Sequence, residues 1–137
     1  MPALAEYGQQ LFPEAHFYSD DEAYAGHQYD LVMASGALQY NEDWRAILPK
    51  LVNATGRYLY VTRIPIVRDG ASFVVLQRAY QTQYLSWHLN RDEFLQAAAA
   101  DRLELLREFL INENLIVDMA PARTFMRGFL FKPARNQ

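Results

Sequence analysis

Residues 29–34 (YDLVMA) limit the possible fold more than any other part of this sequence. The segment is nearly continuous in apolar character, which is typical of a parallel strand buried on both faces. A strand with one face in water instead alternates apolar and polar residues. Ser35 and Gly36 follow the segment and end it. The pattern therefore predicts a central parallel strand in a sheet that helices cover.

Helices and strands alternate over the rest of the chain. Residues 2–12 have a proline in the first turn and apolar residues on one face, which predicts a short helix. Asn41 or Asp43 can cap a second helix, in which Pro49 predicts a kink or an early end. Asn90 is the predicted cap of a third helix.

The predicted strands complete the pattern. The final two have no helix between them, so they must pair antiparallel, because a parallel pair needs a crossover of a dozen or more residues. We therefore predict one α/β domain over residues 1–137, with a mostly parallel sheet that ends in a C-terminal antiparallel strand pair. The predicted strands are residues 16–18, 29–34, 57–64, 72–77 (on an edge or in a hairpin), 103–111 and 124–132, and residues 78–89 are predicted to be irregular.

Composition excludes several classes of function. The chain has 137 residues and a net charge of −3, and its 13 Lys and Arg residues are scattered, unlike the clustered charge of a nucleic-acid-binding surface. It contains no cysteine, which excludes disulfides and thiolate chemistry and fits a reducing, cytoplasmic location. No apolar run approaches the roughly 20 residues of a membrane helix. The three histidines lack the spacing of metal ligands.

The order of elements and several motifs resemble class I S-adenosylmethionine-dependent methyltransferases. Residues 29–40 (YDLVMASGALQY) look like the fourth strand of that fold and its loop, and residues 57–67 (RYLYVTRIPIV) look like the fifth strand. The series ASGALQY, Trp44, YVTRIP and WHLNRDEF resembles, more narrowly, a family of bacterial methyltransferases of unassigned substrate. The resemblance covers residues 3–132. It implies a partial Rossmann-like sheet, S-adenosylmethionine as cofactor, and methyl transfer to an oxygen or nitrogen atom.

The chain departs from that family at the glycine-rich turn. In the family, this turn follows the first strand and lets the backbone approach the cofactor, and an acidic residue after the second strand binds the ribose. This sequence contains no G-x-G, and residues 1–12 match the helix after the second strand. The resemblance thus implies that the first two strands are missing and that residues 29–34 form an exposed edge. We expect a homodimer or swapped assembly, or else a fragment of a longer protein.

The carboxyl ends of two predicted strands carry the candidate cofactor-binding residues. Ligands of open α/β sheets lie at these ends, where the strand order reverses. Small residues after the central strand permit close approach of a ligand, although they also suit a plain turn. The segment 19–21 occupies the position at which the family binds the adenine amino group, although it also suits a solvated turn. The cofactor candidates are Ser19, Asp20, Asp21, Ala34, Ser35 and Gly36.

Three further residues are candidates for contact with the substrate. Gln39 and Tyr40 follow in the same loop, with Tyr40 otherwise a half-buried aromatic residue. Arg63 ends the next strand, where its guanidinium suits a carboxylate or phosphate, or else a surface salt bridge. His88 lies among aromatic residues and is a candidate general base, because the pKa of histidine lies near neutrality. No partner carboxylate is evident from spacing, so a packed or exposed histidine is the alternative.

Functions of different classes fit these features. The first is the C-terminal portion of a methyltransferase that acts on a small-molecule or saccharide-like acceptor, with little activity in this chain alone. The second is a catalytically inactive remnant that oligomerises or binds a partner through its exposed sheet edge. A third is an α/β binding module that shares only the strand pattern, because fold alone does not fix function.

Overall fold

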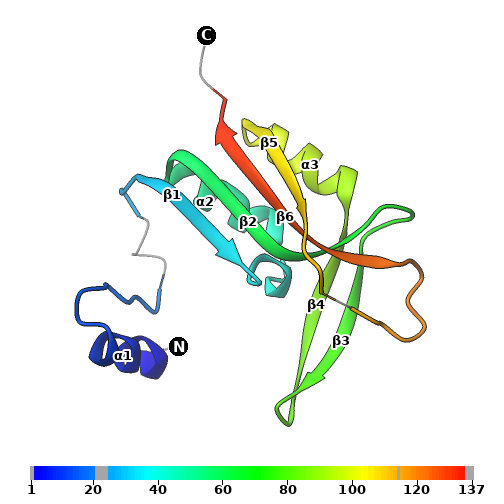
Figure 1. The fold of residues 1–137 in the computed structure, drawn as a ribbon, viewed down its shortest axis with the longest axis horizontal. Coiled ribbons are helices and arrows are strands. Elements are labelled where there is room, and N and C mark those ends of the chain that lie inside the picture. Colours follow the sequence, from blue (N-terminus) through cyan, green and yellow to red (C-terminus); the bar gives the residue numbers. More distant parts are fainter. Residues whose placement is uncertain (1, 21–24, 114, 135–137) are drawn as a thin grey trace.

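A computed structural model describes residues 2–20, 25–113 and 115–134 of the chain. Figure 1 shows a twisted sheet with helices packed against it and the N-terminal helix apart from it. The helices are α1 (Pro2–Leu11), the short 3-10 helix η2 (Leu38–Tyr40), α2 (Trp44–Asn53) and α3 (Arg91–Ala100). The strands are β1 (Tyr29–Ser35), β2 (Thr55–Val67), β3 (Phe73–Ala79), β4 (Thr82–Asn90), β5 (Leu103–Leu110) and β6 (Thr124–Pro133).

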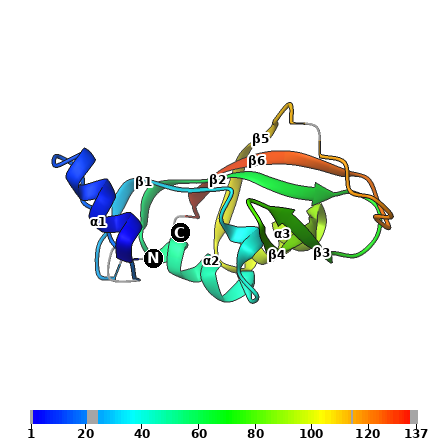
Figure 2. The ribbon, with the colours of Figure 1, turned by 90° about the horizontal axis from the view of Figure 1, so that it is seen from below.

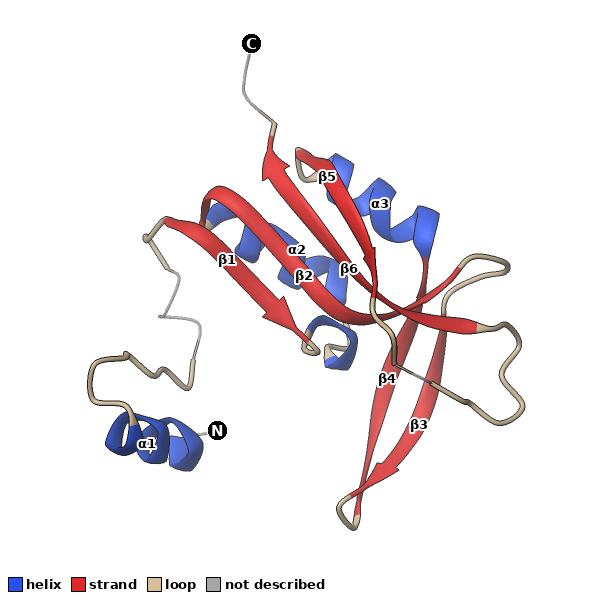
Figure 3. Cartoon of the chain, viewed as in Figure 1, coloured by secondary structure: helices blue, strands red, loops and turns tan. Residues whose placement is uncertain are grey.

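Strand β2 lies at the centre of the sheet (Figure 3). The strand order is β3-β4-β2-β6-β5, and β1 also pairs with β2. The β1–β2 and β2–β4 pairs are parallel, whereas the β2–β6, β3–β4 and β5–β6 pairs are antiparallel. The C-terminal antiparallel pair is therefore confirmed, and the prediction of a mostly parallel sheet is wrong. The physical reason is that β6 inserts beside β2 and runs antiparallel to it, and that the short β3–β4 connection makes another antiparallel pair.

Strand β2 has two successive neighbours along one edge, because β6 occupies its other edge. β1 pairs with residues 55–62 of β2, and β4 pairs with residues 66–67. Residues 63–65 lie between these two partners. Here the register against β6 shifts, and Arg63 has a φ of 54°, as at a β-bulge. The gap between β1 and β4 opens at the carboxyl end of β1.

The hydrophobic core lies between the sheet and helices α2 and α3, which Figure 2 shows beneath one face of the sheet. Leu59 and Val61 of β2 are fully buried on this face, beside Phe129 and Phe131 of β6. The ring of Phe94 from α3 lies 5.0 Å from the ring of Phe129. Full burial of such side chains stabilises the fold by about 1.5–3 kcal/mol each. The core also contains Trp44, Leu48, Ile64, Ile66 and Leu89.

The opposite face of the sheet is open over β1. Leu31 and Met33 are 56% and 61% exposed, and β1 pairs only with β2 among the described strands. Helix α1 forms as predicted, but none of its described residues is buried, and it lies to one side of the sheet in Figure 2. The predicted exposed edge is therefore present in the described part of the chain, whereas the prediction of a central strand buried on both faces is wrong for β1, because no described strand pairs with its other side.

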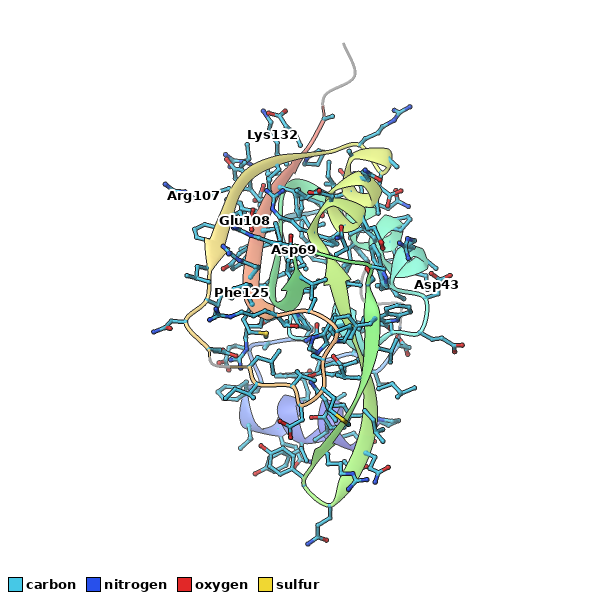
Figure 4. The ribbon with its side chains drawn as sticks, turned by 90° about the vertical axis from the view of Figure 1, so that its right-hand side faces the viewer. Asp43, Asp69, Arg107, Glu108, Phe125 and Lys132 are labelled. Carbon is cyan, nitrogen blue, oxygen red and sulfur yellow. The ribbon has the colours of Figure 1, made fainter. Side chains whose placement is uncertain are left out.

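The helix caps form as predicted. Asp43 accepts a hydrogen bond from the Ala46 backbone at 3.2 Å, and Asn90 accepts from the backbones of Asp92 and Glu93 at 2.9 and 3.0 Å. Figure 4 shows Asp43 on the helical side of the molecule, opposite Arg107 of β5. These caps satisfy backbone donors that the first turn of a helix leaves free.

Two local predictions are wrong. Residues 16–18 form no strand, because no described strand lies beside them to share hydrogen bonds. Residues 82–90 form the regular strand β4 rather than an irregular segment. Each residue from Thr82 to His88 has a partner in β3, so pairing within the hairpin fixes the extended backbone.

A charged cluster joins α3 to the C-terminal strands. Arg91 Nη2 lies 2.8 Å from Glu108 Oε2, and Arg127 Nη1 lies 3.6 Å from Glu108 Oε1. Figure 4 shows Glu108 near Arg107 on β5. The Glu108 side chain is only 17% exposed, so these two arginines offset its loss of hydration.

Candidate functional site

A cavity of about 460 Å³ lies at the gap between β1 and β4. The carboxyl end of β1 forms one wall, and the bulge of β2 forms another. Ligands of α/β sheets bind at such carboxyl ends, outside the sheet. The lining residues are Ser35, Gly36, Gln39, Tyr40, Arg63, Pro65, Gln77, Glu113, Leu115 and Met126. We call this space the strand-end cavity.

The chain turns away from the sheet at Gly36. This residue has a φ of 55°, a conformation that glycine adopts without the steric penalty of a side chain. Its N–H donates to the carbonyl oxygen of Thr62 at 2.9 Å, which extends the β1–β2 ladder by one bond. The turn therefore leaves backbone, rather than a side chain, facing the strand-end cavity.

Gln39 is buried at the boundary of the cavity, with 3% of its surface exposed. Its Nε2 donates to the carbonyl oxygen of Arg63 at 3.1 Å. None of the described groups donates a hydrogen bond to its Oε1. An enclosed acceptor without a donor costs free energy, so this amide is an unusual feature of the site.

Arg63 combines backbone strain with an ion pair. A φ of 54° is uncommon for a residue with a side chain and marks a strained position. The guanidinium Nη2 lies 3.1 Å from Glu113 Oε1, and the two side chains are 56% and 36% exposed. The pair places one positive and one negative group at the cavity, so its net charge is balanced.

The structure brings together five of the predicted site residues. Ser35, Gly36, Gln39, Tyr40 and Arg63 all line the strand-end cavity. Their convergence follows from the parallel pairing of β1 with β2, which aligns Ser35 with Thr62.

The remaining candidates lie elsewhere. Ala34 is buried within β1 and does not line the cavity. Ser19 and Asp20 line a separate surface hollow beside α1. Asp21 lies outside the described residues. The cofactor candidates therefore do not form one cluster in the described structure.

His88 is fully buried and does not line the cavity. Its Nδ1 lies 2.8 Å from Thr124 Oγ1, and its ring stacks on Phe73 at 5.1 Å. Burial lowers its pKa from 6.5 to about 4, so the ring is neutral at pH 7. Its Nε2 is enclosed without a partner among the described groups. This environment matches a packed histidine rather than a base in contact with substrate.

A second, larger space of about 820 Å³ lies between the β3–β4 hairpin and η2. The sequence did not predict this space, because its lining residues come from separate segments that meet only in the folded chain. The one related signal was the group of aromatic residues in segment 78–89. Gln39 and Tyr40 line both spaces. The other lining residues are Asn41, Glu42, Val74, Tyr80, Gln83, Tyr84, Leu85 and Trp87. We call this space the aromatic groove.

Two further features are absent from the described residues. No three of their His, Asp and Glu side chains are grouped so as to hold a metal ion. None of the described helices is long and apolar enough to span a bilayer.

Comparison with known proteins links this arrangement to one fold. No protein-family model and no curated protein matches the sequence. An S-adenosylmethionine-dependent methyltransferase from Methanosarcina mazei matches the structure with a TM-score of 0.62 and 12% identity, over 89% of this chain and 68% of that chain. Magnesium protoporphyrin IX methyltransferase from Synechocystis PCC 6803, solved with bound S-adenosylmethionine, has a TM-score of 0.59 and 17% identity, over 95% and 54%.

A third neighbour is 1,6-didemethyltoxoflavin-N1-methyltransferase from Burkholderia thailandensis, with a TM-score of 0.62 and 13% identity, over 98% of this chain and 57% of that chain. The chain therefore has the fold of class I S-adenosylmethionine-dependent methyltransferases, as its motifs predict. It spans between 54% and 68% of the length of these three neighbours.

Proposed function

We propose that the chain is the C-terminal part of an S-adenosylmethionine-dependent methyltransferase and that the strand-end cavity is its reaction site. The observation that carries the proposal is the convergence of Ser35, Gly36, Gln39 and Arg63 at the carboxyl end of β1. The fold supports it, and so do the neighbours, several of which were solved with S-adenosylmethionine or its demethylated product.

The residues at this end of the sheet fit one end of such a cofactor. Gly36 presents backbone to the cavity, and Ser35 presents a hydroxyl. When bound, S-adenosylmethionine would supply an electrophilic methyl group to an oxygen or nitrogen acceptor and would leave as S-adenosylhomocysteine, and the proton of the acceptor would pass to a base. The carboxylate of Glu113 lines the same cavity and is our candidate to receive that proton.

The main cofactor clamp of the family has no counterpart in this chain. The sequence contains no G-x-G, and among the described residues no strand precedes β1. The backbone amides of such a turn contribute much of the affinity for nucleotide-like ligands. We therefore expect the 137-residue chain alone to bind the cofactor weakly, with a Kd on the order of 1 mM, and to have little activity.

Photochemical cross-linking tests the location of the proposed site. Ultraviolet irradiation of the chain with labelled S-adenosylmethionine should attach label to the peptide that contains Ser35, Gly36 and Tyr40. An excess of S-adenosylhomocysteine should suppress the labelling. Labelling of other peptides alone, or labelling that the competitor does not reduce, would contradict the proposal.

A second candidate function is self-association through β1. Leu31 and Met33 are more than half exposed on a strand that pairs on one side only among the described strands. Exposed apolar edges favour pairing with a second chain. Sedimentation equilibrium of the wild type and of Met33→Lys tests this candidate, with Leu76→Lys on the β3–β4 hairpin as the matched control. The candidate requires a wild-type dimer that Met33→Lys alone dissociates, and a monomeric wild type would exclude it.

A further inference from the structure

The aromatic groove has the size and lining of a small-molecule site. Ligand cavities commonly enclose about 300–1,000 Å³ and have mostly apolar walls with a few polar groups. The groove encloses about 820 Å³. Its walls carry the rings of Tyr40, Tyr80, Tyr84 and Trp87 and the aliphatic side chains of Val74 and Leu85.

Two contacts hold the rings of Trp87, Tyr40 and Tyr84 in place, whereas the fourth ring of the groove, Tyr80, is 98% exposed. Trp87 Nε1 donates to the carbonyl oxygen of Glu42 at 3.1 Å, which ties the hairpin to the segment after η2. The rings of Tyr40 and Tyr84 meet edge to face, with centroids 5.4 Å apart. Side chains that are fixed before binding lose less conformational entropy when a ligand arrives. The groove is therefore preorganised for a flat, apolar ligand.

The groove adjoins the strand-end cavity. Gln39 and Tyr40 line both spaces, so a molecule in the groove lies next to the proposed reaction site. Gln39 also supplies a buried acceptor atom, Oε1, that receives no hydrogen bond from the described groups. A ligand O–H or N–H group can donate to this enclosed atom only after the Gln39 side chain turns toward the boundary.

We propose that the aromatic groove binds the methyl acceptor, and that the acceptor is an uncharged, ring-containing compound with a hydroxyl or amine group. This inference rests on the proposed function, because it places the acceptor beside the same reaction site. The ring system stacks on the aromatic walls, and the hydroxyl or amine lies toward Gln39.

The lining argues against two other classes of ligand. A saccharide carries hydroxyl groups around its ring, and Val74, Leu85 and the ring faces offer them no partners, which leaves the side chains of Gln39, Asn41, Glu42 and Gln83 and the tyrosine hydroxyl groups to bind them. An anionic ligand meets Glu42, the one charged residue among the described residues that line the groove. Like charges repel, so a neutral ring compound fits better than its carboxylate analogue.

The test uses 2-naphthol as the probe, because it is a flat neutral ring system with one hydroxyl group. The isotope-labelled chain is titrated with 2-naphthol to about 1 mM, a concentration that detects weak binding, and two-dimensional NMR follows the indole N–H signals. Trp87 lies in the groove, whereas Trp44 is 1% exposed in the core. We expect the Trp87 signal to shift saturably while the Trp44 signal stays in place.

Matched variants locate the probe. Leu85 and Leu110 of β5 have similar exposures of 62% and 64%, but only Leu85 lines the groove. Leu85→Lys should weaken 2-naphthol binding at least fivefold, and Leu110→Lys should change it less than twofold. 2-Naphthoate and methyl α-glucopyranoside should bind more weakly than 2-naphthol.

Three results would overturn the inference: no shift of Trp87, equal effects of both lysine variants, or tighter binding of the glucoside or the carboxylate. The measurement involves no cofactor, so its failure leaves the proposed methyltransferase function standing. Conversely, failure of S-adenosylmethionine to label the strand-end cavity, with 2-naphthol still bound in the groove, would contradict the proposed function alone.

Discussion

Gln39 and Arg63, which are 24 residues apart in sequence, are joined by a hydrogen bond of 3.1 Å from the Gln39 side-chain amide to the Arg63 carbonyl oxygen. This bond connects the turn after β1 to the bulge of β2, and both residues line the strand-end cavity. The hydrogen bond between Gln39 and Arg63 therefore helps to fix the shape of the cavity that these two residues line.

Gln39→Glu should destabilise the protein in a pH-dependent manner. The substitution replaces the Nε2 donor by an oxygen, which faces the Arg63 carbonyl and can bond to it only when protonated. Burial raises the pKa of such a carboxyl group, so the folded state favours the protonated form and loses stability as pH rises above the unfolded value of about 4.3. We expect a loss of about 2–3 kcal/mol at pH 7 and about 1 kcal/mol at pH 4, relative to the wild type at the same pH. Urea denaturation measures both values, and an equal loss at the two pH values would contradict this account.

Arg63→Gly should be more stable than Arg63→Ala by about 1 kcal/mol. Both variants lose the exposed ion pair with Glu113, which is worth at most about 1 kcal/mol, so the comparison isolates the backbone. Glycine adopts the φ of 54° without steric cost, whereas alanine does not. Thermal or chemical denaturation of the two variants gives the difference. A more stable alanine variant would show that the bulge at Arg63 is unstrained.

The turn of the β3–β4 hairpin should accept glycine with a gain in stability. Tyr80 and Gln81 have φ values of 49° and 63°, as in a two-residue turn that favours Asn and Gly. Gln81→Gly should therefore stabilise the protein by about 0.5–1 kcal/mol. Gln83→Gly, within the neighbouring strand, should destabilise it by a similar amount. If both substitutions are destabilising, the turn lacks the conformation described.

Acid should destabilise the protein through His88. The folded pKa of about 4 lies below the unfolded value of 6.5, so the unfolded state binds the proton more readily between these values. Stability from this group is complete above pH 6.5 and falls as the pH drops toward 4, by about 3 kcal/mol in all. His88→Asn, which retains a polar partner for Thr124, should show a smaller loss over the same range. Parallel pH dependence in the variant and the wild type would contradict the assignment to His88.

The sequence was sufficient to predict the central features of the site. A continuous apolar run followed by Ser35 and Gly36 predicts a strand that ends in a close turn, and helical spacing with caps predicts α2 and α3. Apolar runs, helical spacing and caps each involve residues that are close in sequence, so the sequence alone predicts the elements that they form. The prediction that Arg63 ends its strand is wrong, because β2 bulges at this residue and continues to Val67, where it pairs with β4.

The features that sequence patterns missed depend on contacts between distant segments. Glu113 reaches Arg63 across 50 residues, and no spacing rule predicts that pair. The aromatic groove forms only because the hairpin folds over η2, whereas segment 78–89 by itself has an irregular pattern. Residues 16–18 have the composition of a strand but no neighbouring strand in the described structure. The prediction of a mostly parallel sheet is wrong for the same reason, since β6 inserts between β2 and β5 and runs antiparallel to both.

The most direct test of the central claim is an NMR titration of the isotope-labelled chain with S-adenosylhomocysteine, to about 10 mM because binding is expected to be weak. The account predicts saturable shifts concentrated at Ser35, Gly36 and Gln39, with no change at Leu103 on the far side of the sheet. Gly36→Val, which adds a strained side chain at the turn, should reduce these shifts. An absence of shifts at the strand-end cavity, or shifts confined to other parts of the chain, would contradict the claim that this cavity belongs to a methyltransferase site.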